Sequence, residues 1–132
     1  MDKQNKETII IQLGQLDALI SSLSNIISKE LPIKISYRLS KLLKVIASEH
    51  ELMIQQRNEI INKHAEKDED GNVKQLDDNK INISSPILYQ KEINELCEIG
   101  FNVDFERVSI DELGDINISV QDLLHLDKFF ID

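Results

Sequence analysis

The residues whose types and spacing come closest to a chemical site lie between positions 66 and 77. In EKDEDGNVKQLD, acidic residues occupy the first, third, fifth and twelfth positions and a glycine occupies the sixth. A helix–loop–helix calcium site uses this spacing, because calcium takes six to eight oxygen ligands and glycine allows the sharp turn. The candidate calcium ligands are therefore Glu66, Asp68, Asp70 and Asp77.

The same segment departs from a calcium loop in ways that favour a simpler interpretation. The first position holds Glu66 instead of Asp, the last holds Asp77 where a long bidentate Glu is needed, and Lys74 stands at the ninth. The residues that follow form a poor helix, and no second loop exists to pair with this one. The pair Asp70-Gly71 is typical of a tight turn. We expect a surface turn, with calcium binding as the less favoured alternative.

A second candidate is a row of basic residues in the middle of the first half. Lys34, Arg38 and Lys41 are spaced at i, i+4 and i+7, which places them on one side of a helix. They could bind an anion, an acidic partner, or the acidic half of the chain itself. The alternative, which we favour, is a solvated face opposite the apolar side of the helix.

The charge is distributed unevenly along the chain. Residues 1–64 carry nine Lys and Arg against seven Asp and Glu, whereas residues 65–132 carry six against seventeen. An overall charge of −9 and a pI near 4.8 argue against a nucleic-acid-binding protein. The acidic half predicts a basic protein partner or serves solubility. The acidic residues we expect at such an interface are Asp104, Glu106, Asp111 and Glu112.

The remaining reactive residues form no catalytic pattern. His50, His64 and His125 are far apart in the sequence, and Cys97 is the only cysteine. There is no glycine-rich phosphate loop, no nucleophile motif and no acid–base pair, so we predict no enzyme and no cofactor. A lone cysteine excludes an internal disulfide and favours a reducing compartment. No apolar run approaches the ~18 residues of a membrane span.

The elements that must position these residues can be read from the spacing of the apolar side chains. The β-branched run in residues 7–15 predicts a short strand that ends at Gly14. Apolar residues at spacings of three and four predict helices over residues 15–29 and 35–64, joined at Pro32. The apolar positions of the second helix are Leu39, Leu42, Leu43, Ile46, Met53, Ile60 and Ile61.

The second helix is longer than a compact domain of this size needs. At ~1.5 Å per residue it spans about 45 Å. Its apolar row weakens between Ser48 and Ile60. Such a row either pairs with another copy or a partner, or folds back inside its own domain. The sequence leaves both alternatives open.

The last third combines helix signals with one alternating segment. Ser85, Pro86 and Gly100 predict a helix that ends in a left-handed residue. Residues 101–105 alternate as in a strand, and the alternation slips at Glu106–Arg107 so that Val108 and Ile110 continue the apolar face, which predicts a bulge or turn. SIDE at residues 109–112 and SVQD at residues 119–122 are typical capping boxes, and the second predicts a terminal helix over residues 120–131.

Together these signals predict one α+β domain, mostly helical, that spans residues 1–132. We expect a long helical hairpin over residues 15–64, an acidic loop over 66–84 and an acidic α/β part over 85–132. The hairpin should pack with a small antiparallel sheet that includes residues 9–11 and 101–105. A short C-terminal helix should complete the domain.

Three stretches, taken together, resemble a family of small proteins encoded by phages and prophages of low-GC Gram-positive bacteria. They are NIISKELPIKISYRLSKLLKVI, NKHAEKDEDGNV and INELCEIGFNVDFERVSIDELGDINISVQDLLHLDKFFID. The resemblance covers the chain from about Gln12 to its end. The function of that family is not established, so no residue role can be transferred. The resemblance implies a phage gene product in the host cytoplasm, associated with the virion or free.

We therefore expect a non-enzymatic phage protein that works through protein–protein contacts. In one version it is a virion assembly or accessory protein that forms a homo-oligomer through its long helix. In the other it inhibits a host defence protein by presenting its acidic half to a basic groove. A calcium-binding helix–loop–helix protein is the third and least favoured alternative. None of the three requires a membrane or direct contact with nucleic acid.

Overall fold

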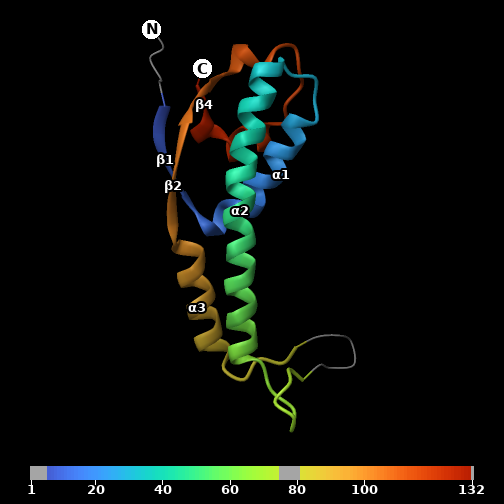
Figure 1. Cartoon of the computed structure of the whole chain (residues 1–132), viewed down its shortest axis with the longest axis vertical. Coiled ribbons are helices and arrows are strands. Elements are labelled where there is room, and N and C mark those ends of the chain that lie inside the picture. Colours follow the sequence, from blue (N-terminus) through green and yellow to red (C-terminus); the bar gives the residue numbers. More distant parts are fainter. Residues whose placement is uncertain (1–5, 75–80, 132) are drawn as a thin grey trace.

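The computed structural model of the chain describes residues 6–74 and 81–131. The protein is α+β and mostly helical, with a long helix, a small antiparallel sheet and a short C-terminal helix, as the sequence predicts. Helix α2 (Ile33–His64) runs along most of the elongated molecule, and the other elements pack around its two halves (Figure 1). At ~1.5 Å per residue its 32 residues measure about 48 Å.

Strands β1 (Lys6–Gln12) and β2 (Gly100–Glu106) form the antiparallel sheet. Ile9 lies opposite Val103, and Ile11 lies opposite Phe101. Side chains of a strand alternate between its two faces, so Ile9 and Ile11 point into the core while Ile10 is exposed. The predicted pairing of residues 9–11 with residues 101–105 is therefore confirmed, although the partners Ile10 and Asn102 are 92 positions apart in the sequence.

A short 3-10 helix, η1 (Leu13–Gln15), connects β1 to helix α1 (Leu16–Ile27). Helix α1 buries one face, formed by Leu16, Leu19, Leu23 and Ile26 together with Ser22. Helix α2 begins directly after Pro32, whose extended backbone interrupts the helical path. The predicted joint at Pro32 is confirmed, and α1 packs against the first half of α2.

The apolar row of α2 is covered within the chain. Ile35, Leu39, Leu42 and Ile46 are buried in the first half, near α1 and the inner face of the sheet. In the second half the neighbour is α3 (Pro86–Glu98), which packs alongside α2 where Met53 is buried. Of the two alternatives left open by the sequence, the row folds back inside its own domain.

Helix α3 begins after Ser85 with Pro86 in its first turn, as predicted, but it does not end in a left-handed glycine. The residue after the helix, Ile99, is extended, and Gly100 is already the first residue of β2. The prediction for Gly100 was wrong because pairing with Gln12 of β1 holds this residue in a strand. A Cβ atom at Gly100 would lie 3.4 Å from Ile10 Cγ2, an ordinary van der Waals contact, so the strand pairing itself does not require glycine here.

The chain after β2 forms a set of short elements at one end of the molecule. Strand β3 (Val108–Ser109) is followed by the 3-10 helix η2 (Ile110–Leu113), helix α4 (Val120–His125), the 3-10 helix η3 (Asp127–Phe129) and strand β4 (Phe130–Ile131). Strand β4 pairs in parallel with β3. The predicted terminal helix thus ends six residues early, because Phe129 and Phe130 are buried and Phe130 lies opposite Val108.

The predicted break after Glu106 is confirmed and marks a change of partner strand. Arg107 lies between β2, which pairs with β1, and β3, which pairs with β4. Val108 is fully buried, as its place on the apolar face predicts, but Ile110 is exposed in η2.

One cluster of buried side chains joins the N-terminal and the C-terminal parts of the chain. Its members that are fully buried are Ile11, Leu16, Leu23, Ile26, Leu39, Ile46, Val108, Leu113, Leu126 and Phe129.

Candidate protein-interaction surfaces

An apolar hollow opens on the C-terminal part of the protein, and we call it the acidic groove. It has a volume of about 390 Å³. Val120 and Leu124 line it although 73% and 66% of their surfaces are exposed to solvent. Large apolar side chains exposed together mark contact sites more often than single ones do. The lining residues are Ile110, Val120, Leu123, Leu124, Asp127 and Phe130.

The acidic groove takes its name from the carboxylates in the segment that forms it. Residues 110–131 carry five acidic side chains and a single lysine. Asp127 lines the hollow, and Asp111 directly follows the lining residue Ile110; both are exposed. An apolar floor with negative charges beside it is complementary to a segment that carries apolar and basic side chains together.

Local hydrogen bonds hold the starts of η2 and α4, two of the elements that line the acidic groove. At the start of η2, the backbone N–H of Ser109 donates to Glu112 Oε1 at 2.9 Å, and the predicted capping box at residues 109–112 is confirmed. At the start of α4, the backbone N–H of Asp122 donates to Ser119 Oγ at 3.1 Å. Between them, Gly114 adopts a φ of 79°, a region that favours glycine.

Helix α4 is also tied to α1 by three polar side chains. The Ser22 hydroxyl donates to Asp122 Oδ1 at 2.8 Å, and its oxygen lies 2.9 Å from His125 Nδ1. Only 1% of the Ser22 surface is exposed. Because the hydroxyl hydrogen points to the carboxylate, the serine oxygen is left to accept a hydrogen bond from the Nδ1–H tautomer of the histidine. A serine nucleophile needs the opposite arrangement, in which histidine accepts the serine proton and the acid orients the histidine.

Sequence reasoning missed this trio, although one signal was present. Ser22 lies three residues after Leu19 and four before Ile26, on the buried face of α1. A serine in that position needs a partner, because a buried hydroxyl without a hydrogen bond is unfavourable. The identity of the partners could not be read from the sequence, since Asp122 is 100 residues away.

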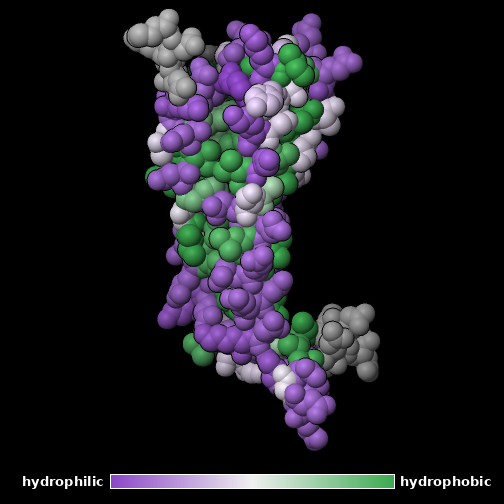
Figure 2. All heavy atoms as spheres, in the orientation of Figure 1, coloured by the Kyte–Doolittle hydropathy of each residue, from purple (hydrophilic) through white to green (hydrophobic). Residues whose placement is uncertain are grey.

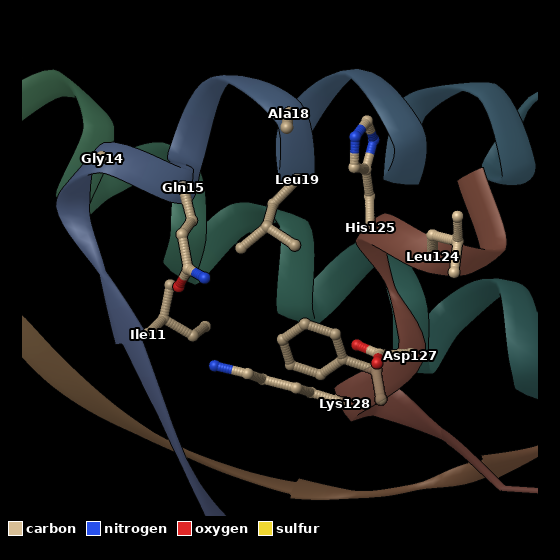
Figure 3. Close-up of a pocket in the computed structure, with 10 residues that line it drawn as sticks. Ile11, Gly14, Gln15, Ala18, Leu19, Leu124, His125, Asp127 and Lys128 are labelled. Carbon is tan, nitrogen blue, oxygen red and sulfur yellow. The ribbon is translucent and has the colours of Figure 1, made fainter. Parts of the chain in front are cut away.

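A second hollow, of about 340 Å³, lies on the other side of the α4–η3 segment (Figure 3). Leu124 and Asp127 line both hollows, so this segment forms the ridge between them. Figure 3 shows Ile11 and Leu19 in the apolar part of this second hollow, which Phe129 also lines. The Lys128 Nζ atom donates to the Ile10 carbonyl at 3.2 Å and thereby ties η3 to β1.

The predicted basic row on α2 divides into an inward and an outward part. Arg38 turns toward Glu106 and Glu112 in the acidic half of its own chain. The sequence left this alternative open, whereas the solvated position that we favoured was wrong for Arg38. Its Nη2 atom donates to the Glu106 carbonyl at 2.5 Å, and its guanidinium lies 3.6 Å from the Glu106 carboxylate and 3.7 Å from that of Glu112. It also lies 5.9 Å from the centre of the Phe105 ring. Arg38 therefore stabilises the domain.

Lys34 and Lys41, in contrast, are exposed and belong to a surface that we call the basic stripe. It consists of the exposed apolar residues Ile33, Tyr37 and Val45 and the lysines at 34, 41 and 44. The exposed fractions of Ile33 and Tyr37 are 81% and 64%. Lys41 Nζ lies 5.4 Å from the centre of the Tyr37 ring, within range of a cation–π contact. Figure 2 shows hydrophobic atoms between hydrophilic ones at the end of the molecule that contains the first half of α2.

The acidic residues predicted for a partner also divide into two groups. Asp104 accepts a hydrogen bond from Thr8 Oγ1 at 2.9 Å, and Glu106 pairs with Arg38, so both act within the domain. Glu112 contributes to the η2 cap and lies near Arg38. Asp111 is exposed next to the acidic groove and is the best placed of the four to meet a partner.

The segment proposed as a calcium loop forms a hairpin turn. Asp68 Oδ1 accepts hydrogen bonds from the backbone N–H groups of Asp70 and Asn72, at 2.9 and 3.0 Å, and Gly71 adopts a φ of 83°. Lys67 and Val73 face each other across the turn. Glu66 accepts a hydrogen bond from Asn82. The expected surface turn is confirmed, and Asp77 lies outside the described residues.

The carboxylates of Glu66 and Asp68 in this turn accept hydrogen bonds from groups of the same chain. Within residues 6–74 and 81–131, no group of three or more His, Cys, Asp or Glu side chains is arranged to hold a metal ion.

Two of the three histidines contact carboxylates. His64 is buried beside Glu92, with Nε2 3.2 Å from Oε1, and its ring packs edge-on against Tyr89. His50 lies 2.7 Å from Asp17.

Within residues 6–74 and 81–131, no helix is both long and apolar enough to cross a membrane.

Lys63 and His64 also change the acidity of Glu92. The Lys63 ammonium lies 2.7 Å from Glu92 Oε1. The hydrogen bond from Lys63, and after it the His64 ring beside the carboxylate, hold the pKa of the Glu92 carboxyl below its usual value. These three side chains join the end of α2 to α3.

In comparisons with known proteins, no family model, curated protein or solved structure matches this chain. We therefore infer its function from its own surfaces.

Proposed function

We propose that this protein functions by binding another protein and that it is not an enzyme. The observation that carries the proposal is the acidic groove, where Val120 and Leu124 are mostly exposed beside the carboxylate of Asp127. Burial of exposed apolar surface contributes roughly 25 cal/mol per Å². Nearby carboxylates attract a basic partner and increase the rate of encounter.

The partner that fits this groove is a segment with apolar and basic side chains on one face. Apolar side chains would enter the hollow between η2 and α4, and lysines or arginines would lie near Asp111 and Asp127. Three of the four acidic residues first expected at the interface, Asp104, Glu106 and Glu112, already contact side chains of their own chain. The proposed contact therefore moves from β2 toward η2 and α4.

The resemblance to phage-encoded proteins leads us to place this activity in a phage life cycle, in the host cytoplasm or in the virion. Inhibition of a host defence protein is supported by the apolar groove and its carboxylates, which would match a basic surface. An assembly role through the apolar row of α2 has less support, because Leu39 and Ile46 of that row are fully buried inside the domain. The exposed face of α2 offers a different route to self-association.

The proposal is tested with a synthetic helical peptide that carries leucines on one face and lysines beside them. We expect the peptide to bind the wild-type protein and to bind Leu124→Arg at least tenfold more weakly, because the new charge repels lysines and blocks the hollow. Fluorescence anisotropy at two salt concentrations measures both effects, and binding should weaken at high salt.

Ile87→Arg is the matched control, since Ile87 is 86% exposed on α3 and lies outside the acidic groove. It adds the same charge and should bind the peptide nearly as tightly as the wild type. Equal losses in both variants would show non-specific charge attraction and would overturn the proposal.

A further inference from the structure

We propose that the acidic groove of one molecule binds the basic stripe of a second copy, and that the two copies form a closed dimer. This inference rests on the proposed function, because it names a partner for the same groove. The chain itself carries the type of segment that the groove fits: a helix face with Ile33, Tyr37 and Val45 exposed and lysines between them.

The charges of the two surfaces are complementary. From position 31 to position 48 the chain contains three lysines and one arginine and no acidic residue. The segment that forms the acidic groove, residues 110–131, contains five acidic residues and one lysine. Interfaces between copies are favoured where such opposite potentials face each other around apolar centres.

Within the described residues, the lysines of the basic stripe make no ion pair, and the contact of Lys41 is with the ring of Tyr37 in the same stripe. Among the described residues, Arg38 makes the ion pairs with Glu106 and Glu112, whereas Lys34, Lys41 and Lys44 make none. The exposed apolar residues of the stripe also lie outside the buried core. The stripe therefore has both charge and apolar surface available for a second molecule.

The position of the two surfaces allows a closed dimer, the form that we infer, instead of an open chain of copies. Arg38 of α2 reaches Glu112 of η2, and Gly114 lies beside Pro32. The groove and the stripe thus lie at the same end of the molecule, as the placement of α1, α2 and the C-terminal elements in Figure 1 also shows. A two-fold axis at this end brings each groove to the other copy's stripe, and both contacts form at once.

Two single variants, each on an exposed residue, test the pairing. Tyr37→Glu places a negative charge in the basic stripe, and Leu124→Arg places a positive charge in the acidic groove. The wild type should sediment as a dimer of two 15.2 kDa chains, and each variant alone should sediment as a monomer. Analytical ultracentrifugation measures the masses, and thermal unfolding followed by circular dichroism checks that both variants remain folded.

Mixing the two variants gives the decisive result. In a mixed dimer, the intact groove of Tyr37→Glu meets the intact stripe of Leu124→Arg, and the two new charges meet with opposite sign. The mixture should therefore recover a dimer that neither variant forms alone. Ile87→Glu is the control for an added charge on α3 and should leave the wild-type dimer unchanged. A monomeric wild type, or a mixture that stays monomeric, would overturn the inference, and species larger than a dimer would overturn the closed form.

The two proposals can fail independently. Tyr37→Glu keeps an unaltered groove, so the synthetic peptide used above is titrated into this variant. If the peptide binds while the wild type is monomeric, the groove is a binding site and the second copy is the wrong partner. If the variants recover a dimer on mixing while the peptide does not bind, the groove accepts its own stripe and the broader proposal of a general basic partner fails.

Discussion

The two halves of α2 are parts of one helix, yet they are held in different ways. The first half buries Ile35, Leu39, Leu42 and Ile46 among α1, the sheet and the C-terminal elements. The second half buries only Met53 and His64, and its main helical neighbour is α3 (Figure 1). A continuous helix therefore does not imply uniform stability, because most helical stability comes from packing of its apolar face.

The polar contacts near the two ends of α2 also differ, because those at the first end are less exposed to water. At the first end the buried Ser22 hydroxyl joins α1 to α4, in contact with Asp122 and His125. At the second end Glu92 joins α3 to α2 through Lys63 and His64, with 30% of its side chain exposed. A buried hydrogen bond is protected from water, whereas an exposed ion pair is screened by salt. We expect the first end to resist unfolding more strongly than the second.

The largest effect should come from removing core volume in the first half of α2. Leu39→Ala should lower the free energy of unfolding by about 2–5 kcal/mol, with Met53→Ala near the lower end of that range. Leu39 is fully buried between several elements, so its neighbours cannot collapse into the cavity. Urea titration measures the free energy of unfolding of both variants. Leu52→Ala is the control at an exposed position, and its free energy of unfolding should stay within about 0.5 kcal/mol of the wild type. A larger loss for Met53→Ala than for Leu39→Ala would reverse the comparison of the two halves.

An intermediate effect should follow from Ser22→Ala. The substitution leaves Asp122 and His125 without their shared partner, and we expect a loss of about 1–3 kcal/mol. Ser21→Ala is the matched control on the same helix, because Ser21 is exposed. Hydrogen exchange should locate the effect of Ser22→Ala in α4. An equal effect of the two variants would mean that the trio contributes nothing beyond helix propensity.

The smallest effect concerns the second end and depends on pH. The pKa of Glu92 is held below its ordinary value of 4.5, so its ionised form is favoured in the folded state. Its contribution to stability is present above pH 4.5 and is lost as the pH falls through the lowered pKa of the folded state. Glu92→Gln should therefore lower the melting temperature slightly at neutral pH and should match the wild type in strong acid. A difference that grows on acidification would contradict this assignment.

Local signals in the sequence were sufficient for most of the elements. The spacing of apolar residues predicted α1 and α2, Pro32 predicted their joint, and the cap at Ser109 predicted the start of η2. The alternation in residues 101–105 and the slip after Glu106 predicted β2 and its end. These features depend on neighbouring residues and backbone geometry, which are encoded within a few positions.

The candidate site could be predicted only in part. Lys34, Lys41 and Asp111 are exposed and fit the surfaces proposed here, whereas Arg38, Asp104 and Glu106 are occupied within the domain. A charged side chain on a helix or strand looks the same in the sequence whether it faces water or an ion pair. Its partner is set by packing between elements that are far apart along the chain, as Arg38 and Glu112 are.

The amino-acid sequence by itself determined which segments form the main helices, which faces are apolar and which half is acidic, since propensity, period and charge are local properties. The tertiary structure alone decided that α2 buries its apolar row inside the domain, that Gly100 and Phe130 belong to strands, and that Ser22 lies between Asp122 and His125. It also brought Ile110 and Val120 to opposite sides of one hollow. Long-range pairing overrides local preference in these places because burial of a large side chain contributes about 1.5–3 kcal/mol, more than most local preferences do.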